Sequence, residues 1–345
     1  MPEAANMTLQ HAAPKMKEFV VACVQPAQYG EWNALVAKSP HGTVFHNSWW
    51  LEATGYELEI LGCWDPNGRL VSGIPLPRKR RAGLLLYHYP PMAPYLGPIF
   101  DLSSEKEPRE QLAIMRHQGE LLAAAIQGFD NLVYSVGAVG PDLQGFLWAG
   151  FRAELSYTFR FEAGTTPEQA MEGSARTCRQ KFRGERAREI SIECGGNVDA
   201  LIELNRETFA RQSRSTPFTE AYLRRMWTVA AERNCGCIYV ARDSSGRPLS
   251  AVLVVHDSRS SYQIVSGMNA DARLSPAGYF TTWAAIRGTL SEKRAFDFEG
   301  SRVRGVERYY RLWGGVAKPV WTLRKAGSLR GQIAVLWANG RNGKN

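Results

Sequence analysis

The sequence predicts a mixed α/β protein of the α+β type, built from two similar units that follow one another along the chain. A strand, two helices, an antiparallel hairpin, a helix and a strand are expected in the first half, and this order recurs after about residue 160. The hairpin turn at Pro66-Asn67-Gly68 has its counterpart in Ser244-Ser245-Gly246. A length of 345 residues also exceeds what one compact core usually accommodates.

Turn chemistry and periodicity divide the first half. Asp65-Pro66-Asn67-Gly68 separates two β-rich runs and is a strong hairpin signal. Four prolines within Tyr89–Pro98 hold a loop in extended conformations. The expected strands are Phe19–Val24, Glu57–Trp64, Leu70–Pro75, Leu84–His88 and Asn131–Val136, and the expected helices are Gln28–Ala37, His46–Ala53 and Glu107–Ile126.

The second half repeats this pattern after Arg152–Glu162, a β-rich run that could belong to either unit. We therefore expect a flexible tail over 1–18, an N-terminal unit over 19–155, a C-terminal unit over 156–328 and a tail over 329–345. The expected strands are Ser191–Cys194, Cys237–Arg242, Leu249–His256, Ser261–Ser266, Ala295–Phe298 and Ala317–Arg324, and the expected helices are Thr166–Arg188 (more than one), Asp199–Ala210, Thr219–Arg233 and Gly278–Leu290.

Composition indicates a soluble globular protein, with 44% hydrophobic and 22% charged residues. No window approaches the roughly 18 apolar residues of a spanning helix, and the start of the chain lacks the apolar core of a signal peptide. We therefore expect a cytoplasmic location, no transmembrane segment and six free cysteines, with peripheral membrane contact left open. The formal charge of +9 favours phosphates, nucleic acid or anionic lipid as partners, although mildly basic soluble proteins are common.

Residues 295–315 combine a short strand, a Gly-Ser turn and a short helix with aromatic and arginine residues on different sides. Alternation predicts Asp297 and Glu299 on one face of the strand, opposite its two phenylalanines. A carboxylate with a raised pKa at such a place can act as a general base. The alternative, favoured for Asp297, is an ion pair that shapes the turn. Its candidate partners are Arg302, Arg304 and Arg308.

A basic stretch precedes the second half's first strand. Its arginines recur at three- and four-residue steps, which predicts one basic helix face. Guanidinium groups bind phosphate in two-point contacts, so the functional hypothesis is a clamp for a diphosphate on a nucleotide-linked acceptor or a carrier lipid. The alternative is a solvated face that neighbouring glutamates partly neutralise. The basic residues are Arg176, Arg179, Lys181, Arg183, Arg186 and Arg188.

Four stretches in this order and spacing resemble a known family: Thr43–Trp50, Pro90–Pro98, Arg176–Arg183 and Phe296–Gly315. They are similar to the tandem-GNAT acyltransferases of the FemABX-like group and to related acetyltransferases of cell-envelope and exopolysaccharide pathways. Members that act with aminoacyl-tRNA often carry a long helical-hairpin arm. No segment between Thr166 and Ser301 is spare enough for such an arm, which leaves the armless relatives open.

The resemblance implies two tandem GNAT-like domains, each a mixed central sheet flanked by helices. It also implies an N-acyltransferase that moves an acyl or aminoacyl group from acyl-CoA or aminoacyl-tRNA to an amine. The acceptor would be a cell-envelope, exopolysaccharide or peptide amine, nucleotide- and lipid-linked ones included. No permanently bound cofactor and no metal are expected. The alternative is a degenerate, non-catalytic tandem that acts as a scaffold or nucleic-acid-binding module.

Residue chemistry and the resemblance together assign residues to roles. The expected catalytic residues are Glu299, Asp297 and Tyr309. Tyr309 and Tyr310 could protonate a leaving thiolate or bind substrate, and core packing is the favoured alternative for at least one of them. A helix start from Ser275 to Tyr279 would hold the CoA pyrophosphate, although its glycine pattern is degenerate and an ordinary helix entry is the alternative. Trp49 and Tyr95 would line a groove for sugar or peptide, or else pack between the domains. The substrate-binding residues are Arg176, Arg179, Lys181, Arg183, Ser275, Ala277, Gly278, Tyr279, Ser301, Arg302, Trp49 and Tyr95.

Overall fold

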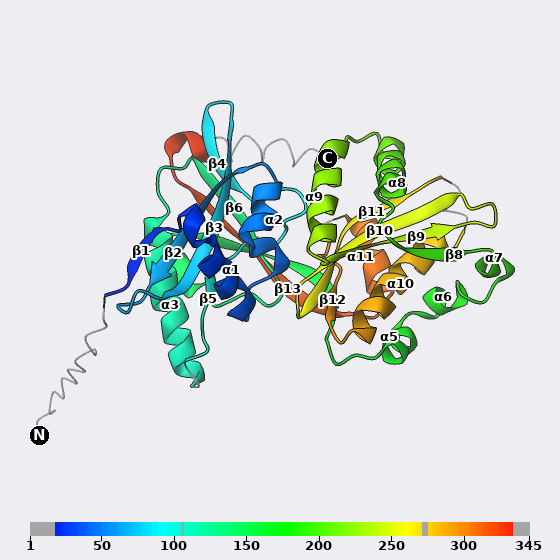
Figure 1. Cartoon of the computed structure of the whole chain (residues 1–345), viewed down its shortest axis with the longest axis horizontal. Helices are drawn as coiled ribbons and strands as arrows, with labels where there is room; N and C mark the ends of the chain where they lie inside the picture. The colour runs from blue at the N-terminus through cyan, green and yellow to red at the C-terminus, as the bar shows by residue number, and fades with distance from the viewer. Residues whose placement is uncertain (1–17, 105–106, 271–274, 302, 334–345) are drawn as a thin grey trace, which may run out of the picture.

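The computed structural model describes residues 18–104, 107–270, 275–301 and 303–333. Their strands form a 13-stranded sheet that continues through both halves of the chain. Its order is β1-β2-β3-β4-β6-β13-β7-β12-β11-β10-β9-β8, and β5 pairs with β3. Figure 1 shows the N-terminal half on the left and the C-terminal half on the right.

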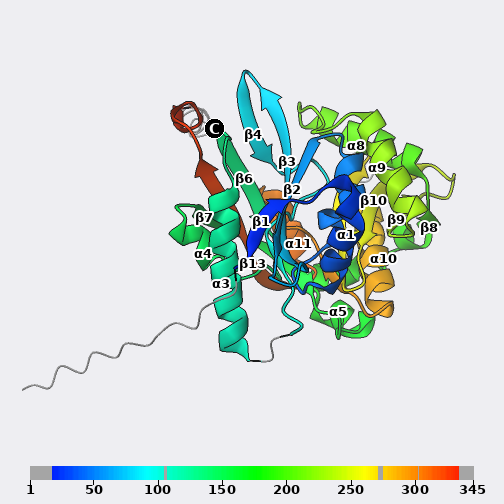
Figure 2. The same ribbon diagram turned by 60° about the vertical axis from the view of Figure 1, so that its left-hand side comes forward.

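In the N-terminal half, four antiparallel strands are followed by a long helix and a parallel strand. The predicted hairpin turn is present, and Asp65 Oδ1 accepts hydrogen bonds from the amides of Asn67 and Arg69. Figure 2 shows α3 and α1 on opposite faces of this part of the sheet. The elements are β1 (Val20–Cys23), η1 (Pro26–Gln28), α1 (Tyr29–Lys38), η2 (Val44–His46), α2 (Ser48–Ala53), β2 (Glu57–Trp64), β3 (Leu70–Arg81), β4 (Leu84–His88), β5 (Ile99–Phe100), α3 (Pro108–Ala125), β6 (Asn131–Val136) and α4 (Gln144–Trp148).

The C-terminal half repeats this plan with β8 to β11 as its antiparallel strands. The elements are β7 (Arg152–Phe161), α5 (Pro167–Gly173), α6 (Arg176–Gln180), α7 (Glu185–Arg188), β8 (Ser191–Gly195), α8 (Val198–Arg211), α9 (Glu220–Glu232), β9 (Gly236–Arg242), β10 (Pro248–His256), β11 (Ser260–Met268), α10 (Ala277–Ser291), β12 (Ala295–Asp297), α11 (Arg304–Arg311) and β13 (Val316–Ala326).

The predicted duplication is confirmed in the pairing of the strands. In each half an antiparallel series ends in one parallel pair, β4 with β6 and β11 with β12, and a long helix makes each crossover. Both halves are therefore mixed sheets of the same design. Two short elements, β5 and α4, were not expected from the sequence, because they span only 2 and 5 residues and such lengths show no periodicity.

The two halves share their central strands and part of their core. β13 comes last in the chain but lies between β6 and β7, with Trp321 opposite Val136 on one side and Leu155 on the other. The largest group of buried apolar side chains runs through both halves, and the rings of Phe45 and Tyr262 lie 4.9 Å apart within it. The domain limits 19–155 and 156–328 stay a prediction. Among the described residues, no helix is both long enough and apolar enough to cross a membrane.

Candidate active site

The sheet opens where β12 ends. β11 and β12 pair in parallel only from Ser260 opposite Ala295 to Tyr262 opposite Asp297. β11 then continues to Met268 with β10 as its remaining strand partner. The register between β10 and β11 also shifts between Leu253 and Val254. A strand that loses one neighbour in mid-sheet leaves room for a ligand on the side of the missing strand.

A cavity of ≈ 500 Å³ occupies this opening, and we call it the α10 cavity. Its walls are the end of α8, strands β10 and β11, the first turns of α10 and the helix α11. Small residues line much of it. Representative lining residues are Arg211, Ser250, Gly267, Gly278, Thr281 and Tyr310.

The start of α10 forms one wall of the α10 cavity. Ser275 Oγ accepts a hydrogen bond from the amide of Ala277, and the amide of Tyr279 donates to the carbonyl of Pro276. Ala277 is buried, while Gly278 lines the cavity. The positive end of the helix dipole therefore meets the cavity at Gly278, where it favours an anion.

Two tyrosines of α11 complete this wall. Tyr309 donates its hydroxyl hydrogen toward the carbonyl of Gly278 and Thr282 Oγ1, both at 2.9 Å, and so ties α11 to α10. Burial raises the pKa of Tyr309 well above its usual value. Tyr310 stacks on Phe298 with ring centres 4.6 Å apart, and burial raises its pKa to about 12. Tyr310 thus lies between the α10 cavity and the end of β12.

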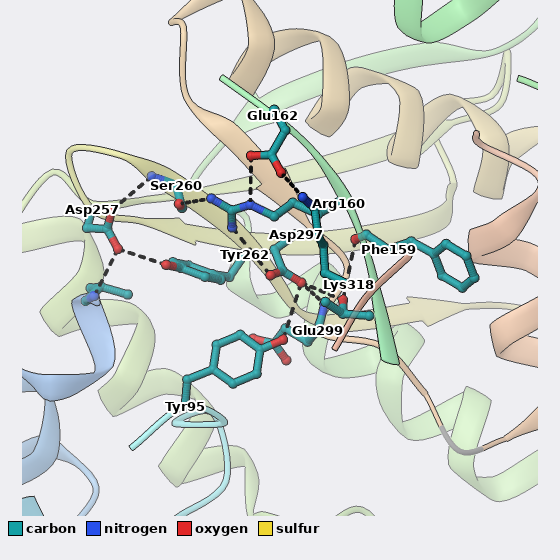
Figure 3. A network of polar contacts seen from close by, with 12 residues as sticks. Tyr95, Phe159, Arg160, Glu162, Asp257, Ser260, Tyr262, Asp297, Glu299 and Lys318 are labelled. Atoms are coloured by element: carbon teal, nitrogen blue, oxygen red, sulfur yellow. Dashed lines mark hydrogen bonds and ion pairs between the residues drawn. The ribbon is translucent and has the colours of Figure 1, made fainter. Parts of the chain in front are cut away.

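Asp297, the last residue of β12, is buried and joins three parts of the fold (Figure 3). Its Oδ1 accepts hydrogen bonds from Thr158 Oγ1 (2.6 Å), the Tyr95 hydroxyl (3.3 Å) and the Glu299 amide (2.7 Å). Its Oδ2 lies 3.5 Å from Arg160 Nη1. Burial raises the pKa of Asp297 against the opposing effect of these contacts.

The ion pair of Asp297 corrects the expected partner. The cation is Arg160 on β7, which is itself buried and also donates to Ser260 Oγ at 2.8 Å. Arg304 and Arg308 are exposed on α11, and Arg302 lies outside the described residues. Arg160 lies 137 residues before Asp297 in the chain, so the sequence around Asp297 gives no sign of this partner. The antiparallel register of β7 against β12 brings the two residues together.

Glu299 follows in a left-handed backbone conformation with φ of 60°, which is uncommon for a residue with a side chain. β12 ends at Asp297, so Glu299 is not part of the strand. The prediction that alternation places Asp297 and Glu299 on one face of a strand is therefore wrong. The next residue must be glycine, because a Cβ at Gly300 would lie 2.3 Å from the carbonyl oxygen of Tyr157. This turn directs Glu299 toward the junction of the two halves, near Tyr95 (Figure 3).

The Glu299 carboxyl group combines a buried oxygen that lacks a partner among the described residues with a raised pKa. Its Oε1 atom is buried and has no hydrogen-bond partner among the described residues. Burial and the neighbouring Asp297 carboxylate raise the pKa of Glu299 well above its usual range. A carboxyl group in such a position binds a proton readily and can take one from a substrate.

A second cavity, of ≈ 290 Å³, lies at the junction of the halves and contains Glu299 in its wall; we call it the junction cavity. Its lining is rich in hydroxyl groups and aromatic rings, with one cation, Arg324. The expected residues Tyr95 and Ser301 are both part of it. The lining residues are Tyr89, Pro94, Tyr95, Ser135, Ser156, Tyr157, Glu299, Gly300, Ser301, Val320, Thr322 and Arg324.

Residues 157–311, from β7 to α11, match the family model described as "Acetyltransferase (GNAT) domain". Over this range the chain is similar to GNAT acetyltransferase domains. The matched range includes both the α10 cavity and the Asp297–Glu299 turn. A search of curated proteins finds no match to the chain.

Solved structures extend the similarity to both halves. FemX has a TM-score of 0.65 and 13% identity, and the match covers 92% of this chain and 99% of that one. A tandem GNAT protein from the clavulanic acid biosynthesis pathway has a TM-score of 0.52 and 13% identity, over 90% and 98%. L-PGS from Bacillus licheniformis has a TM-score of 0.52 and 12% identity, over 93% and 98%. The tandem GNAT fold predicted from the sequence is therefore confirmed.

The prediction that the basic residues share one helix face is wrong. The stretch forms two short helices, α6 and α7, with a turn from 181 to 184, so its arginines do not share one helix face. Arg179 Nη1 donates to the carbonyls of Glu172 and Ser174, while Arg176 and Arg183 are exposed. Gly184 is the N-cap residue of α7 in an extended conformation, and glycine favours such a helix end over a helix interior.

The basic stretch nevertheless lies against the start of α10. Phe182 packs on Phe280 with ring centres 4.8 Å apart, and Lys181 Nζ lies 5.6 Å from the centre of the Tyr279 ring.

Trp49 lines neither of the two cavities. Its ring packs on Trp50 and lies 5.1 Å from the Arg233 guanidinium group. Trp49 therefore packs between the halves, as the alternative interpretation held.

Proposed function

We propose that this protein is an N-acyltransferase that moves an acyl group from an acyl-CoA in the α10 cavity to an amine in the junction cavity. The observation that carries the proposal is Glu299, a carboxyl group with a buried, unpartnered oxygen in the wall of the junction cavity. It lies at the end of β12, beside the opening that holds the α10 cavity. The match to the GNAT family model supports acyl transfer as the reaction class.

Acyl-CoA is the donor that the α10 cavity suits best. CoA carries a pyrophosphate, which the amide-rich start of α10 favours, and Lys181 adds a cation beside Tyr279. Small lining residues such as Gly267 and Gly278 leave room for a thioester chain. The described part of 166–301 forms the sheet and its covering helices and contains no long helical-hairpin arm, which disfavours the aminoacyl-tRNA alternative.

The chemistry needs one proton acceptor and a bound carbonyl. The amine nitrogen attacks the thioester carbonyl, Glu299 takes the proton that nitrogen loses, and the C–S bond breaks to release the CoA thiolate. Asp297 keeps the turn in place and, as a neighbouring anion, makes Glu299 more basic. Tyr309 is assigned a positioning role, because its hydroxyl group is bonded to Gly278 and Thr282.

The acceptor is proposed to be a polar amine, such as an amino sugar or the amine of a peptide. Aromatic rings at Tyr89 and Tyr157 can pack on a sugar or peptide face, and Ser135 and Thr322 offer hydroxyl partners. The resemblance to the FemABX-like group supports a cell-envelope or exopolysaccharide acceptor, nucleotide- or lipid-linked. A cytoplasmic setting fits a reaction that uses CoA thioesters.

The test measures donor binding and turnover separately. Calorimetry with acetyl-CoA and longer acyl-CoAs is expected to show saturable binding at one site per chain. Release of CoA thiol is then followed with a panel of amino sugars and peptides. Glu299→Gln is expected to keep donor binding and lower kcat by roughly 10²–10⁴-fold, because the base is lost. Glu307→Gln, on the exposed side of α11, is the matched control and is expected to keep full activity.

Two results would overturn the proposal. One is binding of charged tRNA at low salt with no saturable acyl-CoA binding, which would favour the aminoacyl-tRNA donor or the scaffold alternative. A scaffold that binds nucleic acid would lose affinity steeply as salt rises, without any turnover. The other is an unchanged kcat in Glu299→Gln, which would remove the base from the mechanism.

A further inference from the structure

Two cysteines meet on one face of the sheet at its C-terminal edge. Cys194 on β8 is paired with Tyr239 on β9, so Cys237, two residues along β9, is its diagonal neighbour on the same face. Their Sγ atoms lie 2.7 Å apart. A disulfide bond is about 2.05 Å long, so the two atoms need to approach by only about 0.7 Å to bond.

The two thiols differ in their surroundings. Cys194 is exposed near the end of β8, whereas Cys237 is half-buried. Burial, with a further contribution from Cys194, raises the pKa of Cys237 to about 12. Cys194 is therefore the thiol that meets reagents in solvent. Once its sulfur is bonded to another sulfur, its own ionisation no longer disfavours a thiolate at Cys237.

We propose that Cys194 and Cys237 form a reversible dithiol–disulfide pair whose oxidants are low-molecular-weight disulfides. The Cys194 thiolate attacks such a disulfide and expels one small thiol, leaving a mixed disulfide. The Cys237 thiolate then attacks Cys194 Sγ, forms the protein disulfide and expels the second small thiol. Two protein thiols are oxidised, and one small disulfide is reduced to two thiols.

The bond would close a loop that carries α8 and α9. α8 contributes Thr208 and Arg211 to the wall of the α10 cavity. α9 holds the N-terminal half, where the Tyr222 hydroxyl donates to the Pro91 carbonyl at 2.6 Å and Arg225 Nε donates to the Ala53 carbonyl at 2.6 Å. A crosslink across this loop restricts the unfolded chain, so the oxidised protein is expected to melt at a higher temperature. The inference does not depend on the donor or acceptor of the proposed reaction.

The experiment equilibrates the full chain with glutathione at graded ratios of oxidised to reduced form, and then blocks free thiols by alkylation. Peptide mass spectrometry is expected to find a 194–237 crosslink that dithiothreitol removes. The melting temperature is expected to rise by roughly 4–8 °C on oxidation and to return on reduction. Cys237→Ser is expected to stop at a mixed disulfide on Cys194, and Cys23→Ser, at another exposed cysteine, to leave the crosslink intact.

The wild-type chain alone can overturn the proposal, whether or not the variants fold. Full alkylation of both cysteines at the most oxidising ratio would do so. A glutathione adduct on Cys194 that persists beside an unoxidised Cys237 would do so too. A crosslink that forms without any change in melting temperature would contradict the restriction of the α8–α9 loop.

Discussion

The Tyr95 hydroxyl of the N-terminal half donates a 3.3 Å hydrogen bond to Asp297 Oδ1 at the end of β12, across 202 residues of chain. Both side chains are buried, and Tyr95 also lines the junction cavity. The hydrogen bond therefore connects the position of the N-terminal half to the turn that carries Glu299. Through this contact, one half of the tandem contributes to the site of the other.

Tyr95→Phe removes this hydrogen bond and keeps the ring. The free energy of unfolding is expected to fall by about 1–2 kcal/mol, because Asp297 loses one buried donor and keeps Thr158. Urea denaturation measures the change. Tyr157→Phe, an exposed tyrosine of the same cavity, is the control and should stay within about 0.5 kcal/mol of wild type. Equal losses in the two variants would show that the Tyr95–Asp297 contact contributes nothing specific.

Glu299 predicts an uncommon dependence of stability on pH. Its pKa is raised in the folded state from an ordinary value of 4.5, so between that value and the folded pKa the folded protein binds more protons than the unfolded chain. The contribution of Glu299 to stability is then largest at acid pH and decreases as pH rises through the folded pKa. Asp297, whose pKa is also raised, contributes with the same sign.

The difference between wild type and Glu299→Gln isolates this effect. Denaturation curves from pH 4 to pH 9 are expected to show that the variant's advantage grows as pH rises, because the amide cannot ionise. His41 and His46 have pKa values lowered to about 4 by burial and act in the opposite direction, but they are common to both proteins. A difference that is constant across this range would mean that the Glu299 pKa is not raised.

Arg160 is predicted to be essential for stability. It is buried, lies 3.5 Å from Asp297 Oδ2 and donates to Ser260. Arg160→Met keeps much of the volume but leaves a buried carboxylate without its cation, which typically costs about 3–5 kcal/mol. Arg311→Met, at an exposed ion pair with Glu307, should cost less than about 1 kcal/mol. Thermal unfolding compares the two, and similar losses would contradict a special role for the buried pair.

Lys181 is predicted to affect donor binding and not the chemical step. Lys181→Ala is expected to raise KM for acyl-CoA several-fold and to leave kcat unchanged, because the cation lies beside Tyr279 at the start of α10 and is not part of the junction cavity that contains Glu299. The effect should shrink at high salt. Arg188→Ala, an exposed residue of the same basic stretch, is the matched control. A lower kcat with unchanged KM would place Lys181 in the chemistry instead.

Local patterns in the sequence were sufficient for most of the elements and for their duplication. Alternation and helical periodicity lie within short windows, and turn residues such as Asn67-Gly68 have backbone preferences of their own. The basic stretch shows the limit of this approach, because residue spacing alone does not reveal that the helix is interrupted. Arg160 shows another limit, because the β7–β12 register brings it to Asp297.

By itself the sequence determined the tandem mixed α/β plan, the carboxylates at the end of β12 and the tyrosines of α11, since each depends on interactions between residues close in the chain. Only the tertiary structure decided that Tyr95 and Arg160 converge on Asp297, that Glu299 lines a cavity between the halves and that Cys194 meets Cys237. These contacts follow from strand register and from the packing of a shared core. Such long-range interactions come from the summed burial of many side chains, and no single segment encodes them.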